Sequence, residues 1–513
     1  MKFNIFGKGR GLRWAITFTC QIAFIFFGYD QGVMSGLVTN KNFLDVVNNP
    51  DDSTEGIMLS IYNLGCFSGC ILNIFLGDYF GRRRSIWFAM AWIVVGASLQ
   101  ASTYGLAQLM VGRFITGIGT GFETSTVPVY QSEVCDASNR GSLVSSEVLF
   151  IGIGLVVSAF FDYGMVHIDS PVGWRVPVAC QLIFALIVTF MVFGLPESPR
   201  YLYSKGRNEE AINVLCELYD MSPEDEKVIQ EQTVIMEALQ MESVAGEYSW
   251  RRIFKKDRVQ TGKRVLLAYG MQFMNQMGGI NLIVYYMPTA LKNNVGLSEN
   301  MSVLLSATIN IMFVVGAIFP TLVADRIGRR KPMIWGSLGC GISMMLVAIL
   351  LSFQGTAHGH VTSSACVAFF YLFMLIYGAT VACIPWVYVP EILPLHVRAK
   401  GSAIAISSNW IWNFFIVMIT PTLINNLRWK AYLIFMCLNF TFIPVVYFFY
   451  PETANLTLEE INLLYAEHDT PTRLVAKRYQ KQMKESGQGI MESKQMFSGD
   501  GEATHYEITN LEE

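Results

Sequence analysis

Long apolar segments alternate with short polar ones along most of this 513-residue chain. About twelve of the apolar segments approach the roughly 20 residues that a helix needs to cross the hydrocarbon core of a bilayer. Their approximate bounds are 14–36, 57–77, 85–103, 106–131, 142–163 and 175–195, and then 264–290, 301–324, 332–353, 364–390, 402–426 and 430–450. The pattern predicts an all-α membrane protein with six spanning helices, a polar interval and six more.

Charged motifs recur at matching places in the two sets of helices. Asp78–Arg83 and Asp325–Arg330 both read Asp-x-x-Gly-Arg-Arg at a border between two apolar segments. Glu133 and Glu391 recur at a similar offset, as does a Pro-Glu pair at 196 and 451 (325 − 78 = 247, 391 − 133 = 258, 451 − 196 = 255). The repeat predicts two related six-helix bundles with pseudo-symmetry.

The same pattern predicts the organisation of the chain. We expect a cytoplasmic N-terminus (1–13), an N-terminal bundle (14–195), a helical linker (196–263), a C-terminal bundle (264–450) and a tail (451–513). In the linker, apolar residues have helical spacing over Glu209–Tyr219 and Asp225–Met241. The tail beyond about 468 has many charges and few large apolar residues, so we expect it to be disordered.

Composition supports a membrane protein and excludes several other classes. Hydrophobic residues make up 52% and charged residues 15% of the chain, against the roughly 25% charge of soluble domains, and the mean hydropathy is +0.38. A net charge of −3 offers no basic surface for nucleic acid. Ten cysteines show neither metal-ligand nor disulfide spacing, so we expect no metal and no cofactor.

Basic residues in the short loops predict the orientation. Arg82–Arg84, Arg140, Arg329–Lys331 and Arg398 fall on one side, whereas the loop 37–55 holds one Lys against four acids. Because Lys and Arg favour the cytoplasmic side, both termini and the linker are predicted to be cytoplasmic. The glycosylation sequon at Asn300 then lies outside and is a candidate for modification.

Two charged residues within apolar segments are candidates for proton chemistry. A carboxylate in hydrocarbon costs at least roughly 2.5 kcal/mol, so Asp30 in the first segment requires a partner, and Arg113 in the fourth is the natural one. If the pair opens when Asp30 binds a proton, protonation and conformation become linked. The alternative is a permanent structural ion pair. Glu123, Glu147 and Asp162 are further acids in or beside such segments, each of which could face a cavity or the interface.

Amide and aromatic side chains gather in the later segments. They suit a neutral polyhydroxylated solute, because amides and phenols supply donors and acceptors without charge and indole rings stack on sugar C–H faces. Gly278-Gly279 loosens the seventh segment where a gate could bend. Interhelical hydrogen bonding and packing or interfacial anchoring are the alternatives for these residues. The candidates are Gln272, Asn275, Gln276, Asn281, Tyr285, Trp386, Asn409, Trp410 and Asn413.

Over about residues 10–465 the chain resembles the sugar porters of the major facilitator superfamily. The resemblance rests on Gly28-Tyr29-Asp30, the two Asp-x-x-Gly-Arg-Arg motifs, Arg113 with its following glycines, Pro128–Glu133, Arg140-Gly141, Pro196–Arg200, Gln276–Asn281 with Tyr285-Tyr286, Pro385–Glu391, Arg398–Gly401 and Pro451–Thr453.

It implies two six-helix bundles rocking around a central sugar site, with Asp30 and Arg113 as the proton-coupling pair. It also implies sugar contacts from Gln276, Asn281, Tyr285, Trp386, Asn409, Trp410 and Asn413. The resemblance further implies a cytoplasmic gate of Asp78, Arg82, Glu133, Arg140, Asp325, Arg329, Glu391 and Arg398.

Departures from the family pattern bear on the substrate. Val148 stands where many hexose porters have a sugar-binding glutamine, with Glu147 beside it as a further candidate contact, and Asn275 replaces the first of two paired glutamines. The stretches around Glu147, Asp162 and Trp174 resemble a fungal branch of pentose and hexose porters and glycerol-proton symporters. Xylose, hexose and glycerol therefore stay open, with a sugar preferred because Trp386 and Trp410 are kept.

The expected function is that of a monomeric plasma-membrane transporter, not an enzyme. It would carry a sugar by alternating access with proton symport through Asp30. The alternatives are a glycerol or polyol symporter, a sugar facilitator that moves no protons, and a transporter-like nutrient sensor.

Overall fold

The computed structural model describes most of the chain as helix. The described residues are 6–135, 140–165, 167–244, 257, 259–354, 356–394, 397–454, 456, 461–462 and 464–465. Within these ranges no strand occurs. The tail beyond 468, where disorder was predicted, lies outside the described residues.

The N-terminal bundle contains six long helices. They are α1 (Arg10–Leu37), α3 (Asp52–Phe80), α4 (Arg82–Ala101), α5 (Leu106–Val134), α6 (Arg140–Met165) and α7 (Val172–Phe193), with the short α2 (Lys41–Val46) between the first two.

The C-terminal bundle repeats this order. It contains α11 (Thr261–Met277) and α12 (Ile280–Ala290) with the π-helical turn η3 (Leu291–Val295), then α13 (Glu299–Ile327), α14 (Arg330–Ser352), α15 (Gly359–Ala379) with α16 (Ile384–Ile392), α17 (Arg398–Leu427) and α18 (Lys430–Phe449).

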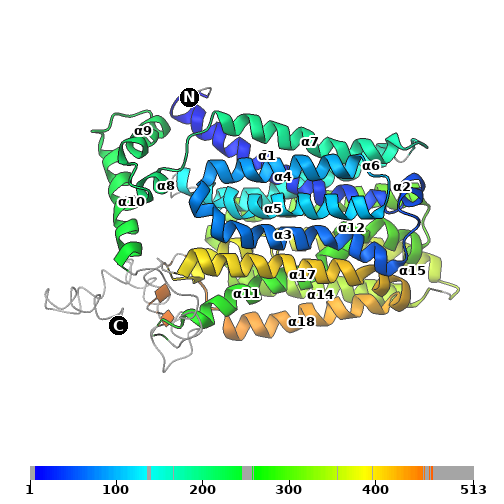
Figure 1. Ribbon diagram of the computed structural model, residues 1–513. Coiled ribbons are helices and arrows are strands. Elements are labelled where there is room, and N and C mark those ends of the chain that lie inside the picture. Colours follow the sequence, from blue (N-terminus) through cyan, green and yellow to red (C-terminus); the bar gives the residue numbers. More distant parts are fainter. Residues whose placement is uncertain are drawn as a thin grey trace.

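Packing within the two bundles is equivalent. In the first, α1 packs on α6, α3 and α4 pack on α5, and α4 packs on α7. In the second, α11 packs on α17, α13 and α14 pack on α15, and α14 packs on α18. The bundles meet along α6 with α13 and along α3 with α17. α3 and α17 lie side by side in Figure 1. The predicted pair of six-helix bundles is confirmed.

Nine spans in the described part of the chain are long and apolar enough to be assigned by composition alone. The other three are α4, α5 and the α11–α12 pair. Basic residues open α4, α5 buries Arg113 and Glu123, and a break divides α11 from α12. These polar features lower the mean hydropathy of the three helices, so composition alone does not identify them as membrane spans although they belong to the bundles.

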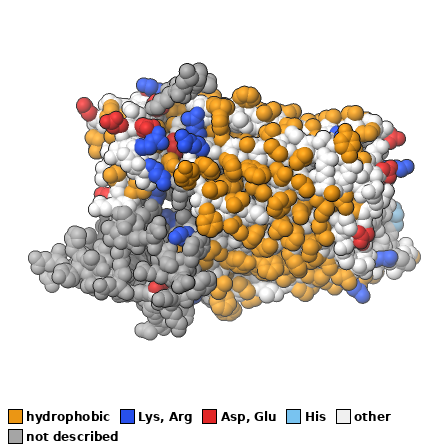
Figure 2. Space-filling view, in the orientation of Figure 1, with side chains coloured by type: hydrophobic (Ala, Val, Ile, Leu, Met, Phe, Trp, Pro, Cys, Tyr) orange, Lys and Arg blue, Asp and Glu red, His pale blue; other side chains and the backbone are white. Residues whose placement is uncertain are grey.

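Large apolar side chains cover the outside of the bundles. Phe190, Leu322 and Phe448 are exposed on spanning helices, where lipid replaces water as the solvent. Figure 2 shows a broad hydrophobic face along the bundle, with Lys and Arg gathered near one end. We call this the basic end, and it is where α3 meets α4 and α13 meets α14.

Three linker helices lie at the basic end. They are α8 (Pro199–Ser204), α9 (Asn208–Tyr219) and α10 (Glu226–Val244), and they include both helical stretches predicted in the linker. The segment before α1 joins them, because the Gly9 N–H donates to the Glu217 carbonyl at 2.8 Å. The start of the first bundle is thereby tied to the linker.

Gly81 and Gly328 make equivalent turns at the basic end. Their backbones lie at φ 81°, ψ 178° and φ 87°, ψ −172°, a region that other residues almost never adopt. A Cβ atom would also stand 2.8 Å from Glu197 Oε2 at Gly81 and 2.7 Å from Glu452 Oε2 at Gly328. Each glycine therefore lets a carboxylate reach the start of the next helix.

We expect Gly81→Ala and Gly328→Ala each to destabilise the protein. The backbone strain alone costs about 1–3 kcal/mol, and the clash with the carboxylate adds to it. The measurement is the melting temperature of detergent-solubilised protein, with unfolding monitored by size-exclusion chromatography. Gly105→Ala is the control, because Gly105 has φ −179° and nothing within 4 Å of a Cβ. Equal melting temperatures for all three variants would contradict the assignment.

Candidate functional site

A cavity of about 70 Å³ lies between the two bundles. Both bundles contribute to its wall, through Phe27, Gln31, Val148, Ile151, Leu155, Asn275, Gln276, Ile280, Asn281, Val284, Phe313, Tyr377, Ala382, Trp386, Asn409 and Asn413.

The wall from the C-terminal bundle is a connected set of amides. Asn281 Nδ2 donates to Gln276 Oε1 at 2.6 Å, and Gln276 Nε2 donates to both Asn275 Oδ1 and Asn409 Oδ1 at 3.1 Å. Asn409 Nδ2 in turn donates to Gln272 Oε1 at 2.8 Å. Gln276 is thus the centre of a network that joins α11, α12 and α17.

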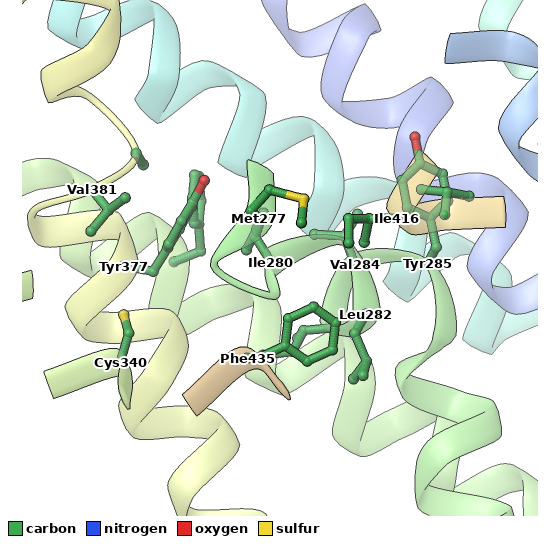
Figure 3. Packing of buried hydrophobic residues seen from close by; sticks show 14 of the residues in the cluster. Met277, Ile280, Leu282, Val284, Tyr285, Cys340, Tyr377, Val381, Ile416 and Phe435 are labelled. Carbon is green, nitrogen blue, oxygen red and sulfur yellow. The ribbon is translucent and has the colours of Figure 1, made fainter. Parts of the chain in front are cut away.

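A break in the helix presents part of this network. α11 ends at Met277, Gly279 has φ 102°, and α12 begins at Ile280, as the glycine pair predicts. The Gly278 carbonyl, freed by the break, accepts a hydrogen bond from Asn439 Nδ2 of α18 at 2.8 Å. Figure 3 shows the turn between Met277 and Ile280. An unwound backbone is tolerated at this depth because protein groups satisfy it.

The wall from the N-terminal bundle is mainly apolar. Phe27 comes from α1, and Val148, Ile151 and Leu155 come from one face of α6. Gln31 of α1 is its polar member and was not among the predicted residues. It lies one position after Asp30, so the spacing of polar residues on α1 could have identified it. Tyr377 and Phe313 were also missed, because single aromatic residues in apolar helices carry no distinguishing pattern.

Six of the ten predicted binding residues line the cavity: Asn275, Gln276, Asn281, Trp386, Asn409 and Asn413. The other four do not. Gln272 supports Asn409 from behind. Trp410 is fully buried and packs edge-on against Phe27 at 5.5 Å and Tyr62 at 6.4 Å between ring centroids. It joins α17 to the N-terminal bundle.

Tyr285 and Glu147 are also not among the residues that line the cavity. Tyr285 is fully buried on α12, and its hydroxyl lies within electrostatic reach of Arg113 and Asp30. Glu147 is 4% exposed, lies within electrostatic reach of Cys20 on α1, and has no hydrogen-bond partner for Oε1. The cavity contact on this part of α6 is the neighbouring Val148.

Asp30 and Arg113 are both fully buried, yet they make no direct ion pair. Both Asp30 carboxylate oxygens are without a hydrogen-bond partner. Arg113 Nη2 donates to the Leu59 carbonyl at 3.1 Å, and its guanidinium lies 5.1 Å from the Tyr62 ring centroid. The predicted contact is therefore corrected: the two charges are close enough to attract, with Tyr62 beside both.

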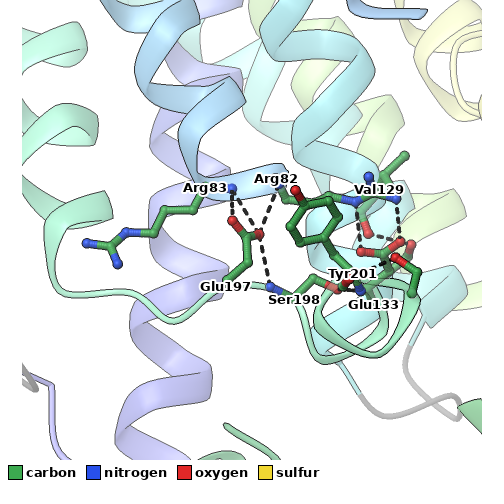
Figure 4. Close-up of polar contacts among 9 residues, drawn as sticks. Arg82, Arg83, Val129, Glu133, Glu197, Ser198 and Tyr201 are labelled. Atoms are coloured by element: carbon green, nitrogen blue, oxygen red, sulfur yellow. Dashed lines mark hydrogen bonds and ion pairs between the residues drawn. The ribbon is translucent and has the colours of Figure 1, made fainter. Parts of the chain in front are cut away.

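At the basic end, the N-terminal bundle holds a bidentate ion pair. Arg82 of α4 donates from Nε and Nη2 to Glu133 of α5 at 3.0 and 2.9 Å. Glu197 accepts from the backbone N–H groups of Arg82 and Arg83 at 2.9 and 3.2 Å and so caps α4 (Figure 4). Burial raises the pKa of the Glu197 carboxyl, although these N–H groups oppose the shift.

The C-terminal bundle repeats these contacts. Arg329 Nη2 lies 2.9 Å from Glu391 Oε1, and Glu452 accepts from the N–H groups of Arg329 and Arg330 at 2.7 and 3.1 Å. Each ion pair lies within a single bundle and fixes the relative positions of the segments that it joins there.

The remaining residues to place are four of the predicted cytoplasmic gate and the asparagine of the predicted glycosylation sequon. Arg398 is half-buried at the start of α17. The side chains of Asp78, Arg140 and Asp325 lie outside the described residues. Asn300 is exposed in the first turn of α13, at the end of the bundle opposite the basic end.

Comparisons with known proteins agree with this architecture. Residues 16–465 match the family described as sugar (and other) transporter. The MFS-type transporter oryC of Aspergillus oryzae is 37% identical over 475 residues, covering 91% of this chain and 88% of that protein. The sugar transporter STL1 of Saccharomyces cerevisiae is 34% identical over 472 residues, covering 90% and 82%.

A solved structure shares the fold. The proton:xylose symporter XylE bound to 6-bromo-6-deoxy-D-glucose superposes with a TM-score of 0.74, covering 88% of this chain and 99% of that one at 24% identity. The two-bundle arrangement is thus the twelve-helix fold of the major facilitator superfamily.

Proposed function

The chain belongs to the sugar (and other) transporter family, and from this premise we propose that it carries a pentose or hexose by alternating access in symport with protons. As a multi-pass sugar transporter of the major facilitator superfamily, it makes and breaks no bond in its cargo. We propose the plasma membrane as its location, with the basic end cytoplasmic and one chain as the working unit.

The observation that carries the proposal is the amide network around Gln276. Uncharged donors and acceptors line one side of the cavity, and half-buried Trp386 offers a ring beside them. Hydroxyl groups can exchange with the amide–amide hydrogen bonds at little net cost, whereas an ionic cargo would find no counter-charge among the residues lining this cavity.

Alternating access follows from the way the bundles meet. Most of the residues that line the cavity are buried between the two bundles. The bundles must therefore move apart at their contacts, α6 with α13 and α3 with α17, for a sugar to enter. Asn425 Nδ2 and Asp52 Oδ1, 2.9 Å apart, link α17 to α3 at the end opposite the basic end and must part there. We propose that each bundle moves as a unit.

A polyol symporter is the second candidate. Its support is the apolar N-terminal wall, where Val148 offers no hydrogen bond. Glycerol has three hydroxyl groups, fewer than a pentose or hexose, and so needs fewer hydrogen-bonding partners. A pentose or hexose remains preferred because the wall retains Trp386 and five amides from the C-terminal bundle.

Uptake of radiolabelled xylose, glucose and glycerol in a transporter-null host tests the proposal. We expect sugar uptake that collapses when an uncoupler is added, together with alkalinisation of a weakly buffered cell suspension. Uptake without alkalinisation would indicate a facilitator. Strict glycerol preference would favour the polyol symporter, and signalling without any uptake would indicate a sensor.

A further inference from the structure

Four buried acids follow α1 through the N-terminal bundle. They are Asp162, Asp30, Glu123 and Glu147, which are 5%, 0%, 1% and 4% exposed, and we call them the acidic file. Neither carboxylate oxygen of the first three has a hydrogen-bond partner, and Oε1 of Glu147 has none. Buried polar groups are nearly always hydrogen-bonded, so four such acids in one bundle require an explanation.

The members of the file lie at successive depths. The Asp162 carboxylate packs against Gly36, where a Cβ would stand 2.6 Å from Oδ2, and Glu147 is within electrostatic reach of Cys20. Gly36, Asp30 and Cys20 are six and ten positions apart on α1, which is about 9 Å and 15 Å of helix. The file therefore spans most of the roughly 30 Å hydrocarbon core.

Glu123 is the neighbour of Asp30 in this file. It comes from α5 and lies within electrostatic reach of Asp30. Two interacting buried carboxylates do not both ionise, so a proton on one favours the charged form of the other.

Two buried hydroxyls also face the region around Asp30. They belong to Tyr62 of α3 and Tyr285 of α12, are fully buried, and have no hydrogen-bond partner. Both can pass or hold a proton. Among the described residues, the other titratable groups in electrostatic contact with the file are Arg113 and Cys66 near Asp30, Tyr29 near both Asp162 and Asp30, and Cys20 near Glu147.

The fold itself does not require these acids. The C-terminal bundle has the same helix packing, yet residues 264–450 contain three acids, Glu299, Asp325 and Glu391. All three lie at or near helix ends. Acids buried in the middle of the helices are thus a feature of the N-terminal bundle. Because the C-terminal bundle forms the same packing without them, the fold does not depend on these acids.

We propose that the acidic file is the proton pathway of the N-terminal bundle, with Glu123 as the residue that takes the proton from Asp30. The O–H bond of neutral Asp30 breaks and a new O–H bond forms on the Glu123 carboxylate. Asp30 is left ionised near Arg113. Glu147 lies further toward the basic end and Asp162 toward the opposite end, so these two acids stand on either side of the Asp30–Glu123 pair along the pathway. The inference rests on the proposed proton symport.

The test is the ratio of proton to solute uptake in Glu123→Gln, Asp162→Asn and Glu147→Gln. We expect solute-driven alkalinisation to fall to background while counterflow exchange of labelled solute continues, because exchange needs no net proton movement. Glu123→Asp should restore alkalinisation. Glu209→Gln is the control, since Glu209 is exposed in the first turn of the linker helix α9, outside the bundles.

Failure of the proposed symport and failure of the acidic file as its proton pathway give different results in this experiment. If the wild-type protein shows uptake without alkalinisation, the proposed symport fails. If the wild type shows coupling and all three amide variants that reach the membrane retain the wild-type ratio, the acidic file is overturned while symport stands. Testing three positions keeps the inference falsifiable when one variant does not fold.

Discussion

Asp30→Asn is expected to abolish solute-driven proton uptake while leaving solute exchange in place. The amide has nearly the shape of the carboxylate but cannot bind and release a proton at physiological pH. Asp30 is fully buried, its oxygens have no hydrogen-bond partner, and Arg113 and Tyr62 lie beside it. The variant should therefore keep the packing of α1 while losing the link between protonation and conformation.

The measurement combines alkalinisation of cells with counterflow in membrane vesicles. Asp45→Asn serves as the control, because Asp45 is exposed on α2 and undergoes the same chemical change. Unchanged proton uptake in Asp30→Asn would disprove coupling through this residue. Loss of the protein from the membrane, with no exchange, would favour a purely structural role.

Much of the fold could be predicted because it depends on one-dimensional patterns. Segment lengths gave the twelve spans, and the repeated Asp-x-x-Gly-Arg-Arg motif gave the two bundles. The structure adds the reason for the glycine in that motif: Gly81 and Gly328 let Glu197 and Glu452 cap α4 and α14. The break at Gly278-Gly279 was also predictable, because two adjacent glycines weaken a helix.

The direction of individual side chains was harder to predict. Adjacent residues on a helix point about 100° apart, so Val148 lines the cavity while Glu147 does not. Trp410 and Asn409 diverge in the same way. A helix that is apolar on nearly all sides has no periodicity to reveal which neighbour a given residue faces. The spacing of Asp30 and Arg113 likewise depends on tertiary packing, since Arg113 donates to the Leu59 carbonyl of α3.

Gln276→Ala is expected to raise the KM for the transported sugar strongly. Gln276 is the central amide of the cavity wall, and its loss leaves Asn281 Nδ2 and Asn409 Oδ1 without a partner. A bound sugar hydroxyl would also lose its amide partner, and an unpaired buried group costs about 1–3 kcal/mol, which corresponds to roughly 5- to 150-fold weaker binding. Initial-rate uptake measured over a range of sugar concentrations gives KM and the maximal rate separately.

A matched variant separates binding from folding. Gln181→Ala removes the same side chain from α7, where Gln181 is fully buried, has no hydrogen-bond partner and does not line the cavity. We expect its KM to stay near that of the wild type, with abundance in the membrane measured for both variants. An unchanged KM in Gln276→Ala would move the binding site away from the amide network. A larger KM effect in Gln181→Ala would show that general loosening of the bundles, and not loss of a sugar contact, weakens binding.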